Sequence, residues 1–162
     1  MADAEIRTLL ELIDQAFDHH SWHGTNLKGA IKGLDTKTAA WRPAAGRHNI
    51  WELILHAAYW KYIARRRLLG EKRGSFALKG SNFFRRPAKG RDDEKALKAD
   101  IALLAETHKS LREAVAGLKT KDLAKMPPGT TTTTLALIMG IASHDLYHAG
   151  QIQLLKRLSK RG

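Results

Sequence analysis

Residues 133–159 read TTLALIMGIASHDLYHAGQIQLLKRLS, and this stretch decides the fold. Its threonines are suited to cap a helix, because their hydroxyls accept hydrogen bonds from free backbone N–H groups. Side chains suited to one buried face recur at alternating steps of four and three residues, which is the period of an α-helix. The stretch therefore predicts one long amphipathic helix. Its predicted buried face consists of Leu137, Ile141, His144, His148, Gln151, Leu155 and Leu158.

Three more segments show the same helical spacing, at 4–20, 50–69 and 93–118. Asn49 is a suitable N-cap for the second of them, and Gly70 suits its end. No segment alternates with the period of a strand. The buried faces of the three segments are predicted as Ile6, Leu10, Ile13, Phe17 and His20; as Ile50, Leu53, Ile54, Ala57, Trp60, Ala64 and Leu68; and as Leu97, Ile101, Leu104, His108, Leu111, Val115 and Leu118.

Four amphipathic helices of this length predict an all-α fold, a four-helix bundle in a single domain over 1–162. A short helical piece is expected at 25–33 and a loop at 34–48. The helix over 50–69 would be about 30 Å long. The linker that follows has about 20 residues and can reach ~66 Å. That is enough to return along the whole bundle, which favours an up-down-down-up order with a long crossover between the second and third long helices.

The composition excludes several classes of protein. There is no cysteine, so disulfides and thiolate ligands are excluded and any metal must use histidine, carboxylate or water. The absence of cysteine fits a cytoplasmic protein. The N-terminal stretch MADAEIRTLL carries acids and has no apolar core, so it does not resemble a secretory signal. The apolar run at 135–142 is too short to span a bilayer, and no membrane partner is expected.

The formal net charge of +12 is concentrated in residues 61–91, which hold eleven basic residues and one acid, Glu71. Such a segment is able to meet nucleic acid, an anionic substrate or an acidic partner. No aromatic stacking platform and no reading-helix motif accompanies it. A solvated loop in a basic protein is therefore the preferred interpretation, with nucleic acid kept as an alternative.

His144 and His148 stand four residues apart in the middle of the predicted buried face, with Gln151 following. Two imidazoles and an amide in one core layer need several polar partners, and a metal ion would satisfy both imidazoles at once. The spacing H-x-x-x-H matches part of the zinc motif H-E-x-x-H but lacks its glutamate. Spacing leaves the third ligand open between His56 and His108. His20 and His23 are weaker candidates.

The chain resembles the DinB-like (YfiT-like) superfamily of metal-binding bundles. The resemblance rests on HDLYHAGQI at 144–152, on the preceding GIASHD, on WHG at 22–24 and on WRPAAGRHNIWEL at 41–53, which leads into His56. These motifs extend over nearly the whole chain.

Membership would imply a four-helix bundle with a long crossover and a divalent metal, often zinc or nickel. The three histidines of the family map onto His56, His144 and His148. Position 143, often histidine in relatives, is Ser143 here. Relatives include proteins similar to thiol-dependent S-transferases and others described as metal-dependent hydrolases. Bundles of this kind often pair, so the resemblance also implies a homodimer.

Three neutral imidazoles would leave a metal with an open position, the arrangement of a catalytic ion. The ion would activate either a water or a thiolate, and the latter would have to come from a low-molecular-weight thiol because the chain has no cysteine. Glu52 and Asp145 are the nearest carboxylates in sequence, and Asp145 lies about 100° around the helix from His144. Glu52 and Gln151 are the candidate helpers.

Three functions follow from these observations. The first is a metal-dependent enzyme, either a transferase or a hydrolase, acting on a small molecule. The second is a bundle that binds a metal or small ligand without turnover. The third is a basic damage-response protein that contacts nucleic acid, whose binding would weaken steeply with salt.

Overall fold

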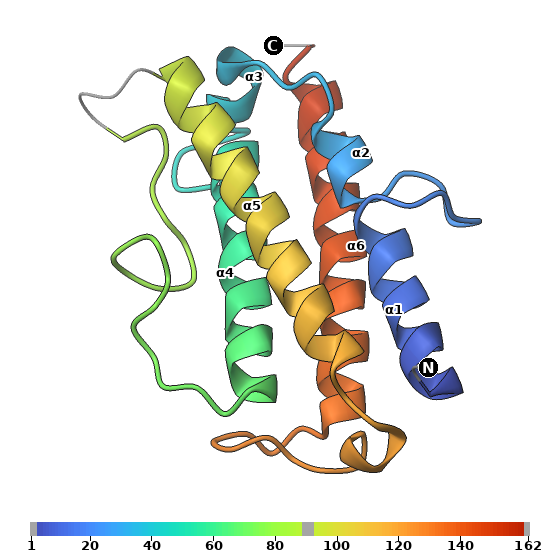
Figure 1. The fold of residues 1–162 in the computed structure, drawn as a ribbon. Helices are drawn as coiled ribbons and strands as arrows, with labels where there is room; N and C mark the ends of the chain where they lie inside the picture. Colours follow the sequence, from blue (N-terminus) through green and yellow to red (C-terminus); the bar gives the residue numbers. More distant parts are fainter. Residues whose placement is uncertain (1–2, 89–92, 161–162) are drawn as a thin grey trace.

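The computed structural model describes residues 3–88 and 93–160, and within them it contains helices and no strand (Figure 1). This confirms the all-α prediction. The long helices are α1 (Ala4–Phe17), α4 (Ile50–Leu68), α5 (Asp93–Ala116) and α6 (Thr134–Leu158), and the short ones are α2 (Leu27–Ile31), α3 (Thr36–Ala40) and a 3₁₀ turn (Thr120–Asp122).

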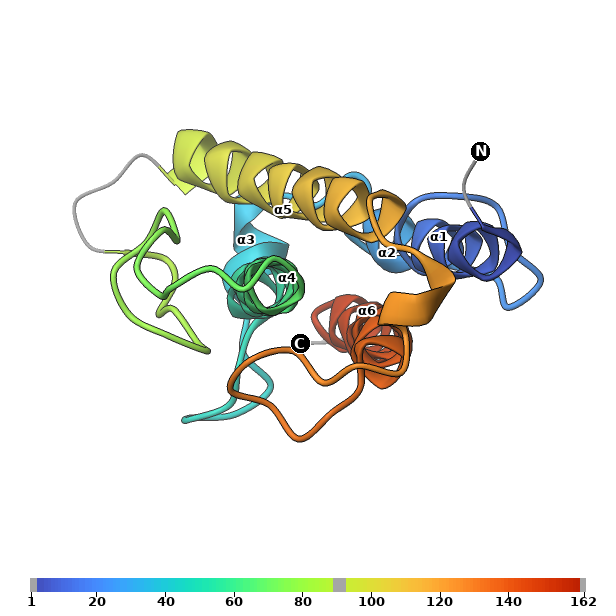
Figure 2. The same ribbon diagram turned by 60° about the horizontal axis from the view of Figure 1, so that its bottom comes forward.

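The four long helices surround a common centre. In Figure 1, α1 runs upward, α4 and α5 both run downward, and α6 returns upward. Figure 2, which looks closer to the bundle axis, shows α4 between α5 and α6, with α1 between the same two helices on the other side. The two parallel helices are joined by the long segment that passes outside α4. The histidine-bearing helices α4 and α6 are therefore antiparallel neighbours.

Local chemistry sets the helix ends. At the start of α4, Asn49 Oδ1 accepts a hydrogen bond from the backbone N–H of Glu52 at 2.9 Å and caps the helix. Just beyond the end of α4, Gly70 adopts the left-handed conformation (φ +68°) that often terminates a helix. The hydroxyl of Thr133 caps α6. The helix α3 lies where a loop was predicted over 34–48, and it begins where Asp35 accepts the backbone N–H of Thr38. This Asp-x-x-Thr cap is a local signal, but the helix is only five residues long.

Two predicted features need correction. The first helix ends at Phe17 rather than at 20, and His20 is exposed outside the core. The buried face of α6 is rotated by about one residue from the predicted one, so Leu137 and His144 lie at its edge. Apolar residues surround most of α6, so the sequence did not single out one face. The observed buried residues are Thr134, Ile138, Ile141, Ala142, Asp145, His148, Ala149 and Ile152.

The core consists of two apolar clusters with a polar layer between them. Along α4, buried Lys61 lies between Ala58 of one cluster and Ala64 of the other. On α6, buried Asp145 stands in the same way between Ala142 and Ala149. His108 of α5 also belongs to this layer, because Lys61 donates to it. Charged groups are therefore placed at mid-height in the bundle, near the histidines of α4 and α6.

The basic segment contributes less surface charge than its sequence suggests. Lys61 is 1% exposed and pairs with Asp145, while Arg86 is 8% exposed and pairs with Asp100 of α5. Arg65 forms two hydrogen bonds with Glu71. Both buried partners lie outside the segment, so counting charge along it could not reveal them. Lys89 and Arg91 lie outside the described residues. None of the described helices is long and apolar enough to cross a membrane.

Candidate metal centre

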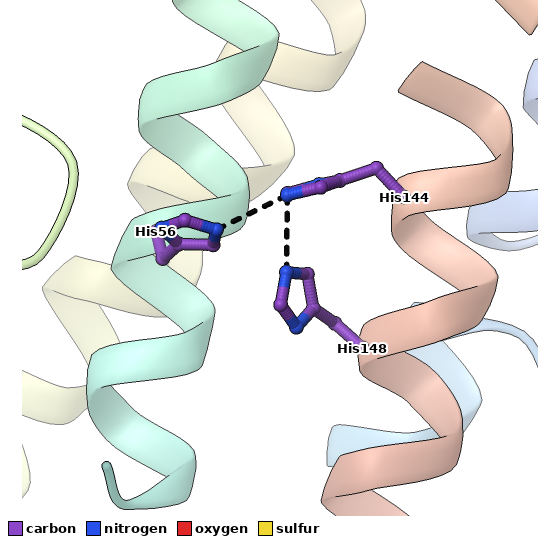
Figure 3. Close-up of side chains that lie close together, drawn as sticks. All are labelled: His56, His144 and His148. Atoms are coloured by element: carbon purple, nitrogen blue, oxygen red, sulfur yellow. Dashed lines mark hydrogen bonds between the residues drawn. The ribbon is translucent and has the colours of Figure 1, made fainter. Parts of the chain in front are cut away.

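Three histidines from two helices meet between α4 and α6 (Figure 3). His56 comes from α4, and His144 and His148 come from successive turns of α6. The Nε2 atom of His144 lies 3.1 Å from Nε2 of His56 and 3.0 Å from Nε2 of His148. One nitrogen from each ring lies within 4.8 Å of the other two. We call these residues the histidine triad.

Hydrogen bonds on the far side of two rings fix where their protons lie. Nδ1 of His56 is 3.0 Å from the carbonyl oxygen of Asn82, and Nδ1 of His148 is 2.7 Å from Oε1 of Gln151. Both partners are acceptors, so each Nδ1 must donate. In the neutral ring Nε2 then carries a lone pair. Two lone pairs therefore point towards the third ring.

His144 cannot satisfy both of them. A neutral imidazole has one N–H, so Nε2 of His144 donates to one neighbour at most. If the proton lies on Nδ1 instead, that atom has no partner among the described residues although it is buried. In either tautomer a buried polar atom lacks a partner, which is costly in a protein interior.

The triad is electrically neutral. Burial, together with the nearby His148, lowers the pKa of His56 to about 4. Burial and the two neighbouring rings lower the pKa of His144 to about 3. Burial also lowers the pKa of His148, against the opposing effect of Gln151. All three rings are therefore in the neutral form near pH 7, with one N–H and one lone pair each, and a metal ligand must be in that form.

The geometry fits a divalent cation. Zinc–imidazole bonds of about 2.0–2.1 Å place the nitrogens of a facial or tetrahedral site about 2.8–3.4 Å apart. The two pairs that include His144 lie in that range, and the nitrogens of the third pair, His56 and His148, lie within 4.8 Å of each other. A cation that accepts all three lone pairs removes the conflict between them, and the Asn82 and Gln151 contacts are the outer hydrogen bonds that orient such ligands.

The segment between α4 and α5 supplies one wall of the site. Phe83 is stacked between His56 and His48, with ring centroids 4.1 and 3.6 Å away. The indole N–H of Trp60 donates to the side chain of Asn82 at 3.0 Å. Asn82 has φ +63°, in the left-handed region that asparagine tolerates better than most residues. These contacts hold the carbonyl that orients His56.

Two pockets reach the triad from different sides. The Arg67 pocket, of about 210 Å³, is lined by Trp60, Ala64, Arg67, Leu137, Gly140 and His144, with Ile63, Thr132, Ala136 and Ile141 completing it. The His48 pocket, of about 380 Å³, is lined by His48, Phe83, Tyr147, His148, Gln151 and Leu154, together with Leu53 and Leu155. Each pocket contains one triad histidine, so small molecules are able to approach the imidazoles.

The two candidate helpers differ in their contacts. Gln151 bonds directly to His148. Glu52 is 4% exposed, and Arg42 and His48 bind its carboxylate. Burial alone would raise the pKa of Glu52, but hydrogen bonds from Arg42, His48 and the backbone N–H of Arg86 outweigh it and lower the pKa to about 2.

The remaining candidate histidines lie apart from the triad. His108 accepts a hydrogen bond from Lys61 at 3.3 Å and stacks on Phe17. His20 and His23 are exposed, and His20 lines a separate pocket beside α2. Of the two third-ligand candidates that spacing left open, the structure therefore brings His56 to the pair on α6.

The fold and the site define a helical bundle with a buried three-histidine group able to hold a metal ion. The family model of the DinB superfamily matches residues 19–152, and the chain belongs to that superfamily. No match was found among curated proteins or among solved structures.

Sequence reasoning did not identify Asn82, Phe83 or His48 as parts of the site. Asn82 and Phe83 lie in an irregular basic segment with no periodic pattern, and their roles depend on the path of that segment along α4. His48 had one usable signal, because it stands four residues before Glu52, close to a helix start.

Proposed function

We propose that this chain is a metal-dependent enzyme of the thiol S-transferase or hydrolase type, with zinc or nickel held by His56, His144 and His148. Three imidazole nitrogens suit these two metals. When bound, the ion would supply a Lewis acid that activates a small thiol or a water molecule. The proposal rests chiefly on the convergence of three neutral Nε2 atoms whose lone pairs the protein leaves without enough donors.

His48 is suited to take the proton from the incoming nucleophile. Its Nδ1 is 2.9 Å from Oε2 of Glu52, so Nδ1–H donates to this carboxylate and Nε2 is free to accept a proton. The side chain is 47% exposed and lines the same pocket as His148. A carboxylate that holds one nitrogen of a histidine fixes the tautomer and the orientation of the ring.

Glu52 then acts as a positioning residue rather than as the base itself. Its low pKa keeps it ionised at neutral pH, and Arg42 fixes the carboxylate from the other side. Phe83 stacks between His48 and His56 and sets the distance between the two rings. Gln151 holds the ring of His148 in place.

The first measurement is the metal content and activity of the purified chain. About one divalent ion per chain is expected after dialysis, and zinc- and nickel-loaded protein would be screened with thiol–electrophile pairs and with esters. A chain that holds no ion at micromolar metal overturns the proposal. A loaded protein inactive on both classes of substrate overturns its enzymatic part.

A matched pair of variants tests the role of His48. His19 makes a similar contact, since its Nδ1 lies 2.8 Å from Asp18, but it is exposed and lines neither of the two pockets. His48→Gln is expected to lower the rate about 100-fold with unchanged metal content, and His19→Gln to change neither. Equal rates for the two variants would contradict a proton-accepting role.

A further inference from the structure

The Arg67 pocket combines an apolar wall with one cation. Apart from His144, its walls are formed mainly by Trp60, Ala64, Leu137 and similar side chains of α4 and α6. Among the described residues that line the pocket, Arg67 is the only one that is always charged, and none carries a carboxylate. A ligand that fills it would meet a guanidinium group in a largely apolar setting, where a charge-assisted hydrogen bond is strong.

Arg67 differs from the two arginines beside it. Arg65 binds both carboxylate oxygens of Glu71, and Arg66 donates to the backbone carbonyl of the same residue. The half-buried side chain of Arg67 makes no hydrogen bond or ion pair with any residue that the structure describes. Of three consecutive arginines, two stabilise the end of α4 and the third faces the pocket.

Gly140 keeps the pocket open. It lies in the interior of α6, where glycine costs about 1 kcal/mol relative to alanine. A Cβ added there would meet no atom within 4 Å, so close packing does not explain the glycine. Because Gly140 lines the pocket, a side chain at this position would take up part of its volume. Gly150, also on α6, has equally open surroundings but does not line the pocket.

We propose that the Arg67 pocket binds the aliphatic part and terminal anionic group of the substrate, with the anion on Arg67 and the chain directed towards His144. The inference rests on the proposed function, because it places the reactive end of the substrate at the triad. The ligand class is a short-chain amphiphile with a carboxylate, and a phosphate is the other source of the same charge. The volume of about 210 Å³ suits a chain of several carbons.

Binding of simple amphiphiles to the purified protein tests this directly. Octanoate, octyl phosphate, octanol and octylamine would be titrated by calorimetry into the metal-loaded protein and into protein stripped with chelator. Octanoate is expected to bind both forms at least about 10-fold more tightly than octanol or octylamine. Tighter binding of octyl phosphate would instead identify a phosphate as the preferred headgroup.

Two matched pairs of variants locate the binding. Arg67→Gln is expected to weaken octanoate at least about 10-fold, whereas Arg157→Gln removes the same charge from an exposed site and changes nothing. Gly140→Leu fills the pocket and abolishes binding, whereas Gly150→Leu leaves it intact. Ala136→Leu, which narrows the same pocket, is the second variant should Gly140→Leu not fold.

The outcomes separate the two proposals. Equal affinity for octanoate and octanol, or unchanged binding in Arg67→Gln, overturns the anion site even if the protein holds its metal. Octanoate binding that disappears on chelation also overturns it, because the carboxylate would then be bound by the metal. A protein that holds no metal but binds octanoate through Arg67 refutes the metal assignment and retains the anion site.

Discussion

Two groups of buried polar side chains lie near mid-height in this bundle, and the protein satisfies them in opposite ways. The ion cluster comprises Lys61, Asp145, His108 and Asp14, all at most 6% exposed. In it, Lys61 donates to Oδ2 of Asp145 and to Nδ1 of His108, and Asp14 lies 3.8 Å from Nε2 of His108, although Oδ1 of Asp145 has no partner among the described residues. In the histidine triad, the Nε2 lone pairs of His56 and His148 both face Nε2 of His144, and the described residues do not supply enough donors for the three rings.

The difference shows what distinguishes a candidate ligand from a structural histidine. His108 is at least as buried as the triad histidines, and burial, followed by the charge of Lys61, lowers its pKa to about 3. Its Nδ1 lone pair nevertheless has a donor, and its ring stacks on Phe17 at 3.8 Å. Burial and a low pKa are common to both groups. What separates them is whether a protein donor faces the lone pair.

Removing one ligand gives the largest expected effect and tests the comparison most directly. His144→Ala leaves two imidazoles and is expected to weaken metal binding by at least about 1000-fold, so that no ion survives dialysis. His108→Gln removes an equally buried histidine and should keep close to one ion per chain. Elemental analysis of both variants measures this. Metal loss in His108→Gln would show that the two groups are not independent.

Removing a charge from the ion cluster should lower the stability of the fold rather than the affinity for metal. Asp145→Asn leaves Lys61 buried without its carboxylate and is expected to lower the free energy of unfolding by about 3–5 kcal/mol. Replacing the pair by Lys61→Met with Asp145→Leu should recover most of that loss, because buried ion pairs contribute little beyond apolar packing. Urea unfolding of metal-free protein compares the two. If the double variant is as unstable as Asp145→Asn, the Lys61–Asp145 pair contributes more to the free energy of unfolding than apolar packing in its place.

The sequence predicted the helices well and the polar groups only in part. The spacing located all four long helices to within about three residues, because apolar periodicity and caps are local properties. It could not orient α6, whose apolar residues occur on several faces. Asp145 occupies the centre of its buried side because Lys61, more than eighty positions earlier, supplies the opposite charge. Such pairing depends on how two helices meet, which no local pattern contains.

The same limit applies to the third ligand. Helical spacing placed both His56 and His108 near buried faces, and the resemblance to DinB-like proteins was needed to prefer His56. The structure adds the physical reason, since Lys61 occupies the lone pair of His108 while Nε2 of His56 points towards His144. Asn82, which orients His56, belongs to a segment whose path is set by contacts with α4.

Removing a hydrogen-bond partner of a triad histidine should lower the metal affinity by less than removing a ligand. Gln151→Leu removes the acceptor that holds Nδ1–H of His148 and is expected to weaken metal binding about 10- to 100-fold. Gln151→Glu keeps an acceptor and should bind metal at least as well as the native chain. Competition with a coloured chelator measures both. Unchanged affinity in Gln151→Leu would indicate that the histidine pair on α6 needs no such support.

Acid should produce the smallest effect per group. The pKa values of His56 and His144 fall from 6.5 to about 4 and about 3 on folding, so between these values and 6.5 the unfolded chain binds more protons. Stability of the metal-free protein should therefore decrease as the pH falls below about 6.5, by about 1 kcal/mol for each histidine between pH 6.5 and pH 5.5. Metal-loaded protein starts from a higher stability and loses the ion as its ligands become protonated.

The stability of the metal-free protein and that of the metal-loaded protein, each plotted against pH, should converge towards about pH 4. In the His144→Ala variant, added metal should leave the stability unchanged at every pH. Curves that stay parallel through this range would show that the added metal is held by groups other than the triad.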